Sequence, residues 1–408
     1  MKQQELIPHL FRTEYRKIVS VLCRHFGFDQ IEIAEDLASD TFVTAAQTWS
    51  IKGLPANPTA WLYNVAKNKA KNHIQRSSVF DHKISPEIKN TTPQYYETDI
   101  DLSPQNINDS QLQMMFAICH PAISTEAQIG LSLRILCGFG IDEIADAFLT
   151  NKETINKRLY RAKEKLREEK VSISPPNDKG INERLAPVLI TIYLLFNEGY
   201  YSVSANTPLR KDLCFEAMRL CTMLVEEPTT NKPAVNALLS LMCFHASRFE
   251  ARINENGEHV LYDDQDTSLW DTDLMRKGAY FLNQAASGTT VSKYHLEATI
   301  AYWQTQKADT IRKWKTVLSL YDQLLLIEYS PVAALNRVYV LSKIRGKEAA
   351  IIEAEKWNLP YDQFYFTLLG ELYTGIDDTQ AKLHLQNAIS LAKTATDRLA
   401  LQKKIDKL

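Results

Sequence analysis

Glycine and proline are scarce in this chain, with 13 and 15 copies among 408 residues. The chain also lacks any stretch near the ~20 uninterrupted apolar residues that a membrane span needs. Its first residues lack the apolar core of a signal peptide. The richest apolar run, 186–196, is too short to span a bilayer and is interpreted as a buried helix. These absences exclude a membrane-spanning class and predict a cytoplasmic protein without a membrane partner.

Sequence patterns of metal sites and of common catalytic centres are also missing. The six cysteines form no CxxC pair and show no regular spacing, and the nine histidines are scattered. No HExxH pair, Gly-rich phosphate loop or Ser/His/Asp order occurs. We therefore expect no metal, no cofactor and no enzymatic activity. The cysteines are interpreted as buried, reduced thiols.

Leucine, alanine and isoleucine are abundant instead, and 45% of the residues are apolar. That composition, with so few helix-breaking residues, predicts an all-α fold. A chain of 408 residues is long enough for two to four domains with separate cores.

Charge is distributed unevenly although the net charge is only −2. Residues 52–76 hold five Lys/Arg and no acid, and residues 152–170 hold eight Lys/Arg against four acids. Between them, residues 77–110 hold six acids and two lysines. Two basic islands separated by an acidic strip indicate two DNA contacts and a linker.

The second basic island lies in a pair of short amphipathic helices. Residues 141–149 carry apolar side chains on one helical face, and residues 152–167 repeat that pattern with basic residues elsewhere. A tight polar turn joins the two runs. This arrangement predicts a helix-turn-helix whose second helix enters a DNA major groove. A basic, solvated helix of an ordinary bundle is the alternative.

The first basic island ends a helical domain and mixes aromatic, amide and basic side chains. Aromatic rings stack on unpaired bases, amides bond base edges and lysines hold phosphates. The run therefore indicates a surface for single-stranded DNA, with a solvated cationic face and a core Trp61 as the alternative. The interleaved residues are Trp61, Tyr63, Asn64, Lys67, Asn68, Lys69, Lys71, Asn72 and Arg76.

Turn residues and polar stretches divide the chain into parts. The predicted parts are a helical domain over 6–76, a flexible acidic linker over 77–110, a second helical domain over 111–170 and a larger helical region over 181–408. In the first domain the apolar spacing predicts helices over 9–26, 31–49 and 59–75.

The C-terminal region shows weak internal repetition. The segment 369–388 nearly follows the small/large alternation of a 34-residue tetratricopeptide unit, and 331–359 resembles another. An irregular helical bundle is the alternative.

Two further motifs stand before the repeats. Asn197–Tyr200 is predicted to end a helix with Gly199 at its C-cap. The acidic segment 261–271, which lacks a calcium-loop spacing, is predicted to dock on another surface of the same chain.

The order of these parts resembles a sigma factor of the extracytoplasmic-function group. Ala34-Glu-Asp-Leu-Ala-Ser-Asp-Thr-Phe-Val-Thr-Ala-Ala46 is similar to the group's polymerase-binding helix. Asn57-Pro-Thr-Ala-Trp-Leu-Tyr-Asn-Val-Ala-Lys-Asn-Lys-Ala70 is similar to its promoter-melting and −10-reading segment, and 141–167 to its −35-reading module. His120-Pro-Ala122, Tyr193–Tyr200 and 261–271 resemble a subgroup with a fused, tetratricopeptide-like C-terminal domain.

The resemblance implies a protein that binds core RNA polymerase and directs it to promoter DNA. The residues implied for polymerase binding are Glu35, Asp36, Leu37, Asp40 and Phe42. Those implied for the −10 single strand are Asn57, Trp61, Asn64, Lys67, Asn68 and Lys71. Those implied for −35 DNA are Lys152, Thr154, Asn156, Lys157, Arg158 and Arg161.

The C-terminal region is expected to contact the sigma domains and control them in cis, in place of a separate anti-sigma partner. A peptide or small-molecule ligand of that region, the promoter sequence, the inducing signal, the sign of control and the oligomeric state stay open. The alternative function is a stand-alone helix-turn-helix regulator with a helical-repeat sensor. That alternative leaves the polymerase-binding and melting motifs unexplained.

Overall fold

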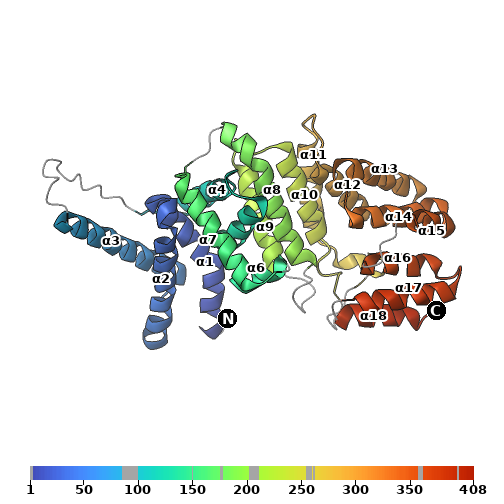
Figure 1. Ribbon diagram of the computed structural model, residues 1–408, viewed down its shortest axis with the longest axis horizontal. Coiled ribbons are helices and arrows are strands. Elements are labelled where there is room, and N and C mark those ends of the chain that lie inside the picture. The colour runs from blue at the N-terminus through green and yellow to red at the C-terminus, as the bar shows by residue number, and fades with distance from the viewer. Residues whose placement is uncertain are drawn as a thin grey trace. The chain divides into compact units, whose positions relative to one another are not determined.

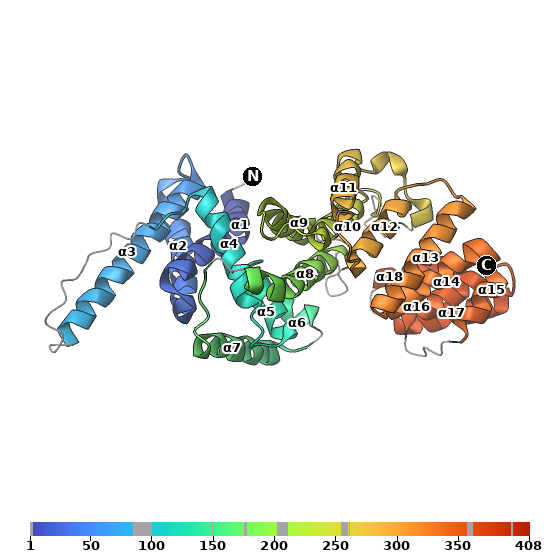
Figure 2. The ribbon, with the colours of Figure 1, turned by 90° about the horizontal axis from the view of Figure 1, so that it is seen from above.

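The computed structural model describes residues 3–84, 100–148, 150–174, 178–201, 211–253, 260, 262–356, 362–392 and 395–408. Over that part of the chain the regular elements are α-helices and three short 3-10 helices, without a β-strand (Figures 1 and 2). The prediction of an all-α fold is confirmed. Contacts divide the chain into two compact units, residues 1–192 and 193–408, and each is described by itself.

In unit 1, α1 packs against α2, α3 and α4, and α5, α6 and α7 pack against one another. The bounds are α1 (Gln3–Phe26), η1 (Phe28–Gln30), α2 (Ile31–Lys52), α3 (Pro58–Ile84), α4 (Pro104–Ile118), α5 (Thr125–Ile135), α6 (Ile141–Ala147) and α7 (Lys152–Glu168). Helix α8 (Asp178–Tyr201) begins in unit 1 and ends in unit 2.

Helices α1, α2 and α3 pack together around one apolar core. Ile18 and Leu22 of α1, Ala38 of α2 and Leu62 of α3 are all fully buried. Gly27 ends α1 with a φ of +86°, a left-handed conformation that favours glycine. The C-terminal part of α3 extends past α1 and α2 (Figures 1 and 2).

The helices on either side of the predicted linker are longer than expected. Helix α3 continues to Ile84, and α4 begins at Pro104, capped by Ser103 whose side chain accepts a hydrogen bond from Asn106 N. Asn106 also accepts a hydrogen bond from Arg24 of α1 at 2.7 Å. The described helices thus enter the predicted linker, 77–110, from both ends. Residues 85–99 of this stretch lie outside the described part of the chain.

Helices α5, α6 and α7 form a small cluster with α7 as its longest member. Ile155, Leu159 and Leu166 of α7 are buried, as their helical spacing predicts. Asn151 caps α7 by accepting a hydrogen bond from Thr154 N at 2.8 Å. Residues 148–151 alone separate α6 from α7.

Unit 2 is a series of helices. The bounds are α9 (Lys211–Glu226), α10 (Pro233–Ala246), η2 (Tyr262–Asp264), η3 (Thr267–Leu269), α11 (Thr272–Ala285), α12 (Lys293–Gln304), α13 (Ile311–Ile327), α14 (Pro331–Arg345), α15 (Lys347–Ala354), α16 (Gln363–Tyr373), α17 (Asp378–Leu391) and α18 (Ala395–Ile405).

The prediction that a helix ends at Gly199 is wrong. Helix α8 continues to Tyr201, and Gly199 lies inside it. The ring of Tyr200, which follows, is fully buried and packs 5.6 Å from Phe196 and 4.7 Å from His245. Burial of this aromatic residue one position after the glycine keeps the helix intact where local propensity favours a stop.

The segment 261–271 docks on its own unit, as predicted. The Tyr262 hydroxyl donates to the carbonyl of Gln304 at 2.6 Å, and Lys307 Nζ donates to the carbonyl of Gln265 at 3.2 Å. Trp270 is only 6% exposed. The aromatic side chains therefore fasten the segment against the end of α12.

Helices α16 and α17 of unit 2 pack against each other. In α16 and α17, Gly370 lies so close to Leu385 that a Cβ on the glycine would stand 2.7 Å from Leu385 Cγ. Ala381 and Ala388 are fully buried beside them. These small residues allow α16 and α17 to approach each other closely.

All six cysteines are buried and none is in a disulfide. Burial raises the pKa of the Cys119 thiol to about 12 and that of Cys243 to about 12. Within the described residues, no helix combines the length and the apolar character needed to cross a membrane.

Candidate functional site

The α2 helix presents an acidic face. Asp36 and Asp40, four residues apart and so on one side of the helix, are exposed, and Leu37 is half-buried between them. Asp40 also pairs with Lys69 of α3. The side chain of Glu35 is 17% exposed. Four of the five residues implied for polymerase binding therefore lie at the surface or at its edge.

Phe42, the fifth of these residues, lies in the core instead. It is 5% exposed, and its ring packs 5.1 Å from Phe11 and 6.3 Å from Tyr15 of α1. Phe42 was implied for polymerase binding by the resemblance alone, and the side of α2 that meets α1 buries it. It supports α2 from within rather than offering a surface.

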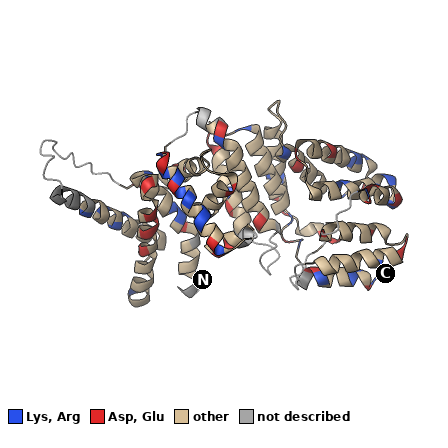
Figure 3. Cartoon of the chain, in the orientation of Figure 1, with Lys and Arg blue, Asp and Glu red and all other residues tan. Residues whose placement is uncertain are grey.

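Ion pairs join the acidic helix α2 to the basic helix α7. Lys163 Nζ lies 2.8 Å from Glu35 Oε2 and 3.8 Å from Glu32 Oε1. Arg167 pairs with Glu32 as well. The Lys163 side chain is 13% exposed, so this contact is largely shielded from solvent. Figure 3 shows the Asp and Glu residues of α2 and the Lys and Arg residues of α7.

Two further contacts tie α1 to its neighbours in unit 1. The Tyr15 hydroxyl donates to the carbonyl of Glu35 at 3.4 Å, and Arg16 of α1 donates to the carbonyl of Cys137 at 3.5 Å. Burial raises the pKa of the Tyr15 hydroxyl, so it stays protonated as a donor. Sequence patterns gave no signal for these contacts, because their partners are far apart along the chain.

Helix α3 exposes most of the residues implied for single-stranded DNA. Asn64, Asn68 and Lys71 are exposed and Lys67 is half-buried. Their spacing of three and four residues places all four on one side of the helix. This side can offer amide donors and acceptors together with positive charge.

The start of α3 serves the fold as well as the surface. Asn57 is exposed, and its Oδ1 accepts a hydrogen bond from Ala60 N at 3.0 Å, which caps the helix. Trp61 is half-buried and its ring lies edge-on to Trp49, with centroids 5.3 Å apart. One edge of Trp61 is thus committed to the core of the domain.

Tyr63 has a role that sequence reasoning did not find. Its hydroxyl donates to Glu14 Oε2 at 2.5 Å, which ties α3 to α1. Burial, together with this hydrogen bond to an anion, raises the pKa of Tyr63. The tyrosine was grouped with the aromatic residues of a DNA surface, but its polar end is used within the domain.

Helix α7 exposes the residues implied for −35 DNA along one side. Thr154, Asn156, Lys157 and Arg161 are exposed. Lys152 is exposed as well and pairs with Asp142 of α6 at 2.5 Å. These polar side chains therefore lie outside the core, which the opposite side of the helix contacts.

Arg158 stands between the exposed side of α7 and its neighbour α6. It is half-buried, with its guanidinium 5.2 Å from the centroid of the Phe148 ring. Stacking of this kind orients a guanidinium without neutralising it.

A groove lies between α7 and the beginning of α5. Its volume is about 490 Å³, and Lys157, Arg158, Arg161 and Lys165 line one side. Ser124, the N-cap of α5, lines the other. The N-terminus of a helix carries partial positive charge and unpaired backbone N–H groups. The groove therefore suits an anionic group such as a backbone phosphate. The contribution of α5 was not predicted.

Comparisons with known proteins bear on the first three helices. Residues 10–79 match the family described as sigma-70 region 2. This chain carries a sigma-70 region 2 domain. The match covers most of α1, the whole of α2 and most of α3. A second stretch, residues 184–286, matches a family of unknown function (DUF6596).

Two relatives cover different shares of the chain. It is 24% identical over 167 residues to the RNA polymerase sigma factor YlaC of Bacillus subtilis (strain 168), a match to 41% of this chain and 93% of that protein. It is 29% identical over 387 residues to the uncharacterized protein R00370 of Rhizobium meliloti (strain 1021), over 93% of this chain and 91% of the relative. No solved structure matches the chain. The region 2 domain and the sigma factor relative together support a sigma factor role in transcription initiation.

The region 2 domain carries both α2 and α3, so two of the three implied surfaces lie within it. The ion pairs of Glu32 and Glu35 connect this domain to α7, which lies beyond the matched residues. The polar residues of the third implied surface lie on that same α7 helix.

Proposed function

We propose that this protein is a sigma factor of the extracytoplasmic-function type, which binds core RNA polymerase and directs it to a small set of promoters. The observation that carries the proposal is the region 2 match over residues 10–79. It coincides with the helices that bear the acidic face of α2 and the amide-rich side of α3.

Three surfaces, on α2, α3 and α7, would each have a separate role in this function. Asp36, Leu37 and Asp40 of α2 would contact the polymerase clamp, where each exposed charge pair contributes only about 0–1 kcal/mol. Asn64, Asn68 and Lys71 of α3 would hold the opened −10 strand through base edges and phosphates. Because each surface is small, assembly with polymerase would make promoter binding multivalent.

The helix pair α6–α7 would act as a helix-turn-helix that reads −35 DNA. Thr154 and Asn156 are exposed near the start of α7, where such helices contact base edges. Lys157 and Arg161 would hold phosphates, and Arg158, stacked on Phe148, would hold a phosphate or a guanine. The groove beside α5 supports this role, since its four basic side chains and a helix N-terminus face the same space.

The ion pairs between α2 and α7 bear on how this protein would bind polymerase. Glu35, one of the residues implied for polymerase binding, pairs with Lys163 of α7. Polymerase binding through Glu35 would therefore compete with that ion pair. We infer that the region 2 domain and α7 separate when the protein joins polymerase.

The C-terminal region would control the sigma domains in cis as a tetratricopeptide-like module. The hairpin of α16 and α17, with Gly370 against Leu385, supports that architecture. Such modules bind protein partners on stacked helix pairs. The R00370 relative spans nearly the whole chain, which is consistent with both parts acting in one protein.

Run-off transcription with purified core polymerase tests the proposal. Promoter DNA would come from upstream of the protein's own gene and its neighbours. The full-length protein would be compared with a fragment that ends at Tyr201. This end retains α8, whose Arg184 donates to the carbonyl of Phe116 in unit 1 at 3.1 Å. We expect transcripts that depend on the protein and a difference between the two forms that gives the sign of C-terminal control.

Two other outcomes would change the assignment. Equal polymerase binding and equal transcription by the two forms would exclude control in cis. If neither form bound core polymerase while the full-length protein shifted duplex DNA, the protein would be a stand-alone helix-turn-helix regulator. An Asp36→Arg variant should weaken polymerase binding severalfold, whereas Glu226→Arg, an exposed acid on α9, serves as the matched control.

A further inference from the structure

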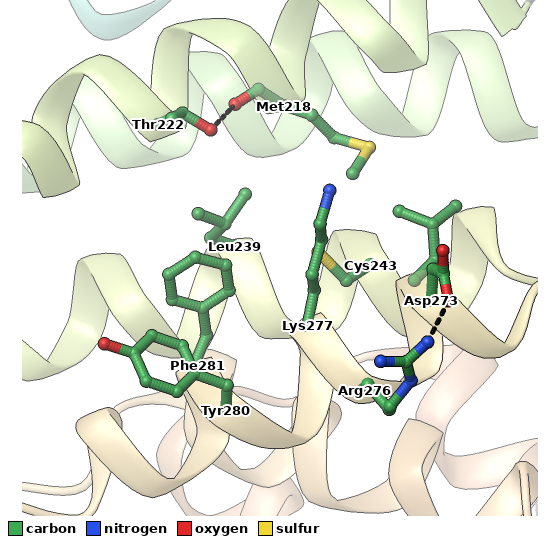
Figure 4. A pocket seen from close by; sticks show the side chains of 10 residues that line it. Met218, Thr222, Leu239, Cys243, Asp273, Arg276, Lys277, Tyr280 and Phe281 are labelled. Atoms are coloured by element: carbon green, nitrogen blue, oxygen red, sulfur yellow. Dashed lines mark hydrogen bonds and ion pairs between the residues drawn. The ribbon is translucent and has the colours of Figure 1, made fainter.

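A groove crosses unit 2 between α9 and α11, with α10 as its floor (Figure 4). Its volume is about 580 Å³. Leu239 and Cys243 of α10 line the floor, Met218 and Thr222 of α9 form one wall, and Phe281 of α11 belongs to the other. All of these residues lie within 184–286, the stretch that matches a family of unknown function. The groove is separate from the sigma surfaces described above.

Helix α11 is held firmly although little of it is buried. Gly278 and Ala285 are the buried residues of its 14. A Cβ on Gly278 would stand 2.8 Å from the Phe244 ring, so α11 sits directly on α10. Ser240 of α10 donates to the carbonyl of Gly278 at 2.7 Å, which fixes this seat. Contacts with α10 therefore fix the position of α11, and no ligand in the groove is needed to hold it there.

The apolar side of α11 stays accessible. Tyr280 is 58% exposed, and Leu274 and Phe281 are partly exposed in the groove lining. A firmly seated helix that keeps large apolar side chains in contact with water marks a surface for a partner. Packing against that partner would remove this apolar area from solvent.

The groove carries one strong polar element. Figure 4 shows Lys277 of α11 extending between the walls toward Met218, with its Nζ at the end. Arg276 pairs with Asp273 on the same helix. Lys277 has no ion-pair partner among the residues that the structure describes. A positive charge amid apolar walls favours an occupant with a carboxylate at that point.

The three helices present side chains at the same spacing. Positions 218 and 222 on α9, 239 and 243 on α10, and 277 and 281 on α11 are each four residues apart. Rows at this spacing form ridges along helices, and ridges of one helix fit the grooves between those of another. A ligand whose side chains repeat at the same spacing, and so fit between these rows, is an α-helix.

We propose that the groove binds an amphipathic helix of a partner protein, with apolar side chains four residues apart and an acidic residue that meets Lys277. The helix would complete a four-helix arrangement with α9, α10 and α11. This is the helix-in-groove mode of recognition, in which apolar anchors give affinity and a charge selects orientation. The inference does not depend on the sigma assignment, because unit 2 supplies every residue of the site.

The test uses the full-length protein and a displayed library of helical peptides about 14 residues long. Apolar residues would be fixed at every fourth position, and the position between them would vary over acidic, neutral and basic residues. We expect selection to enrich acidic peptides. Their dissociation constants would rise about tenfold with Lys277→Glu. The matched control, Lys315→Glu on α13, should leave binding unchanged, since Lys315 is exposed away from the groove.

A second variant tests the apolar contacts. Thr222→Trp places a large ring in the groove from a half-buried position on its wall. It should block the acidic peptides, while circular dichroism shows an unchanged helix content. Hydrogen exchange should show protection of α9 and α11 by the bound peptide.

Three outcomes would overturn the proposal. The first is a library that yields no peptide sensitive to both Lys277→Glu and Thr222→Trp. The second is dodecanoate binding with the same sensitivity while no peptide binds, which would assign the groove to an acyl carboxylate. The third is a concentration-dependent dimer that Lys277→Glu dissociates, which would assign it to a second copy of this chain.

Discussion

Lys163 of α7 and Glu35 of α2 form an ion pair across 128 positions of the sequence, with Nζ and Oε2 2.8 Å apart. The pair joins the sigma-70 region 2 domain to the helix that we propose reads −35 DNA. Both side chains are mostly shielded, at 13% and 17% exposure. Two of the three proposed functional surfaces of unit 1, those on α2 and α7, are thus connected through Glu35, which belongs to the first of them.

Removing one partner of this pair should destabilise unit 1. Lys163→Ala leaves the Glu35 carboxylate partly buried without its close cation, and we expect the free energy of unfolding to fall by about 1–3 kcal/mol. Urea denaturation followed by circular dichroism measures this loss. Lys165→Ala is the control on the same helix. Lys165 is 46% exposed and pairs with Glu168 and Glu169, so its loss should stay below about 0.5 kcal/mol.

The basic side of α7 should set the salt dependence of promoter binding. In the holoenzyme, Lys157→Ala and Arg161→Ala should each weaken promoter binding. Each should also make the slope of log affinity against log salt shallower by about 1, because one phosphate contact is lost. Titrations at several salt concentrations measure the slope. Lys315→Ala removes an equal charge from unit 2 and should leave it unchanged, and equal slopes for all three variants would contradict the assignment of α7.

The contact between Gly370 and Leu385 should make α16 intolerant of a larger residue. Gly370→Ala introduces a Cβ 2.7 Å from Leu385 Cγ, and we expect a loss of about 1–3 kcal/mol from overpacking. Thermal unfolding measures it. The same substitution in a Leu385→Ala background should cost less, because the clashing atoms are absent. Gly140→Ala is the control, since its Cβ would meet Glu143 Oε2 at an ordinary 3.5 Å.

Glu297 should make the stability of unit 2 depend on pH. Burial raises the pKa of its carboxyl to about 7, against the opposing effects of the Lys293 charge and the hydrogen bond from the Tyr193 hydroxyl at 3.2 Å. The folded protein therefore holds this proton more tightly than the unfolded chain. Its contribution to stability is complete below about pH 4.5 and is lost as the pH rises through about 7.

A Glu297→Gln variant isolates this contribution. Glutamine retains an acceptor for the Tyr193 hydroxyl but does not ionise. The variant should match the wild-type protein at pH 5 and exceed it in unfolding free energy at pH 8. Parallel pH-dependent curves for the two proteins would show that Glu297 does not titrate in this range.

The local elements of the fold were accessible from sequence because they depend on neighbours along the chain. Ile155, Leu159 and Leu166 repeat at helical spacing, and all three are buried in α7. The docking of 261–271 followed from a tryptophan among acids, since Trp270 needs a core that its own segment cannot supply. The all-α class followed from composition in the same way.

The errors and omissions have a different physical origin. Phe42 was assigned to polymerase binding through the resemblance, whereas its burial results from packing against α1. Gly199 favours a helix end, but the packing of Tyr200 overrides it. The ion pair of Lys163 with Glu35 joins two segments that are far apart in the sequence. The pattern of each segment is explained without the other, so neither pattern predicts the pair.

Because all six thiols are buried, their reactivity reports local opening of the structure. Cys23, Cys119 and Cys137 lie in unit 1, and Cys214, Cys221 and Cys243 lie in unit 2. A buried thiol reacts only when its surroundings open. Alkylation followed by mass spectrometry would therefore time the exposure of each unit separately, without any introduced label.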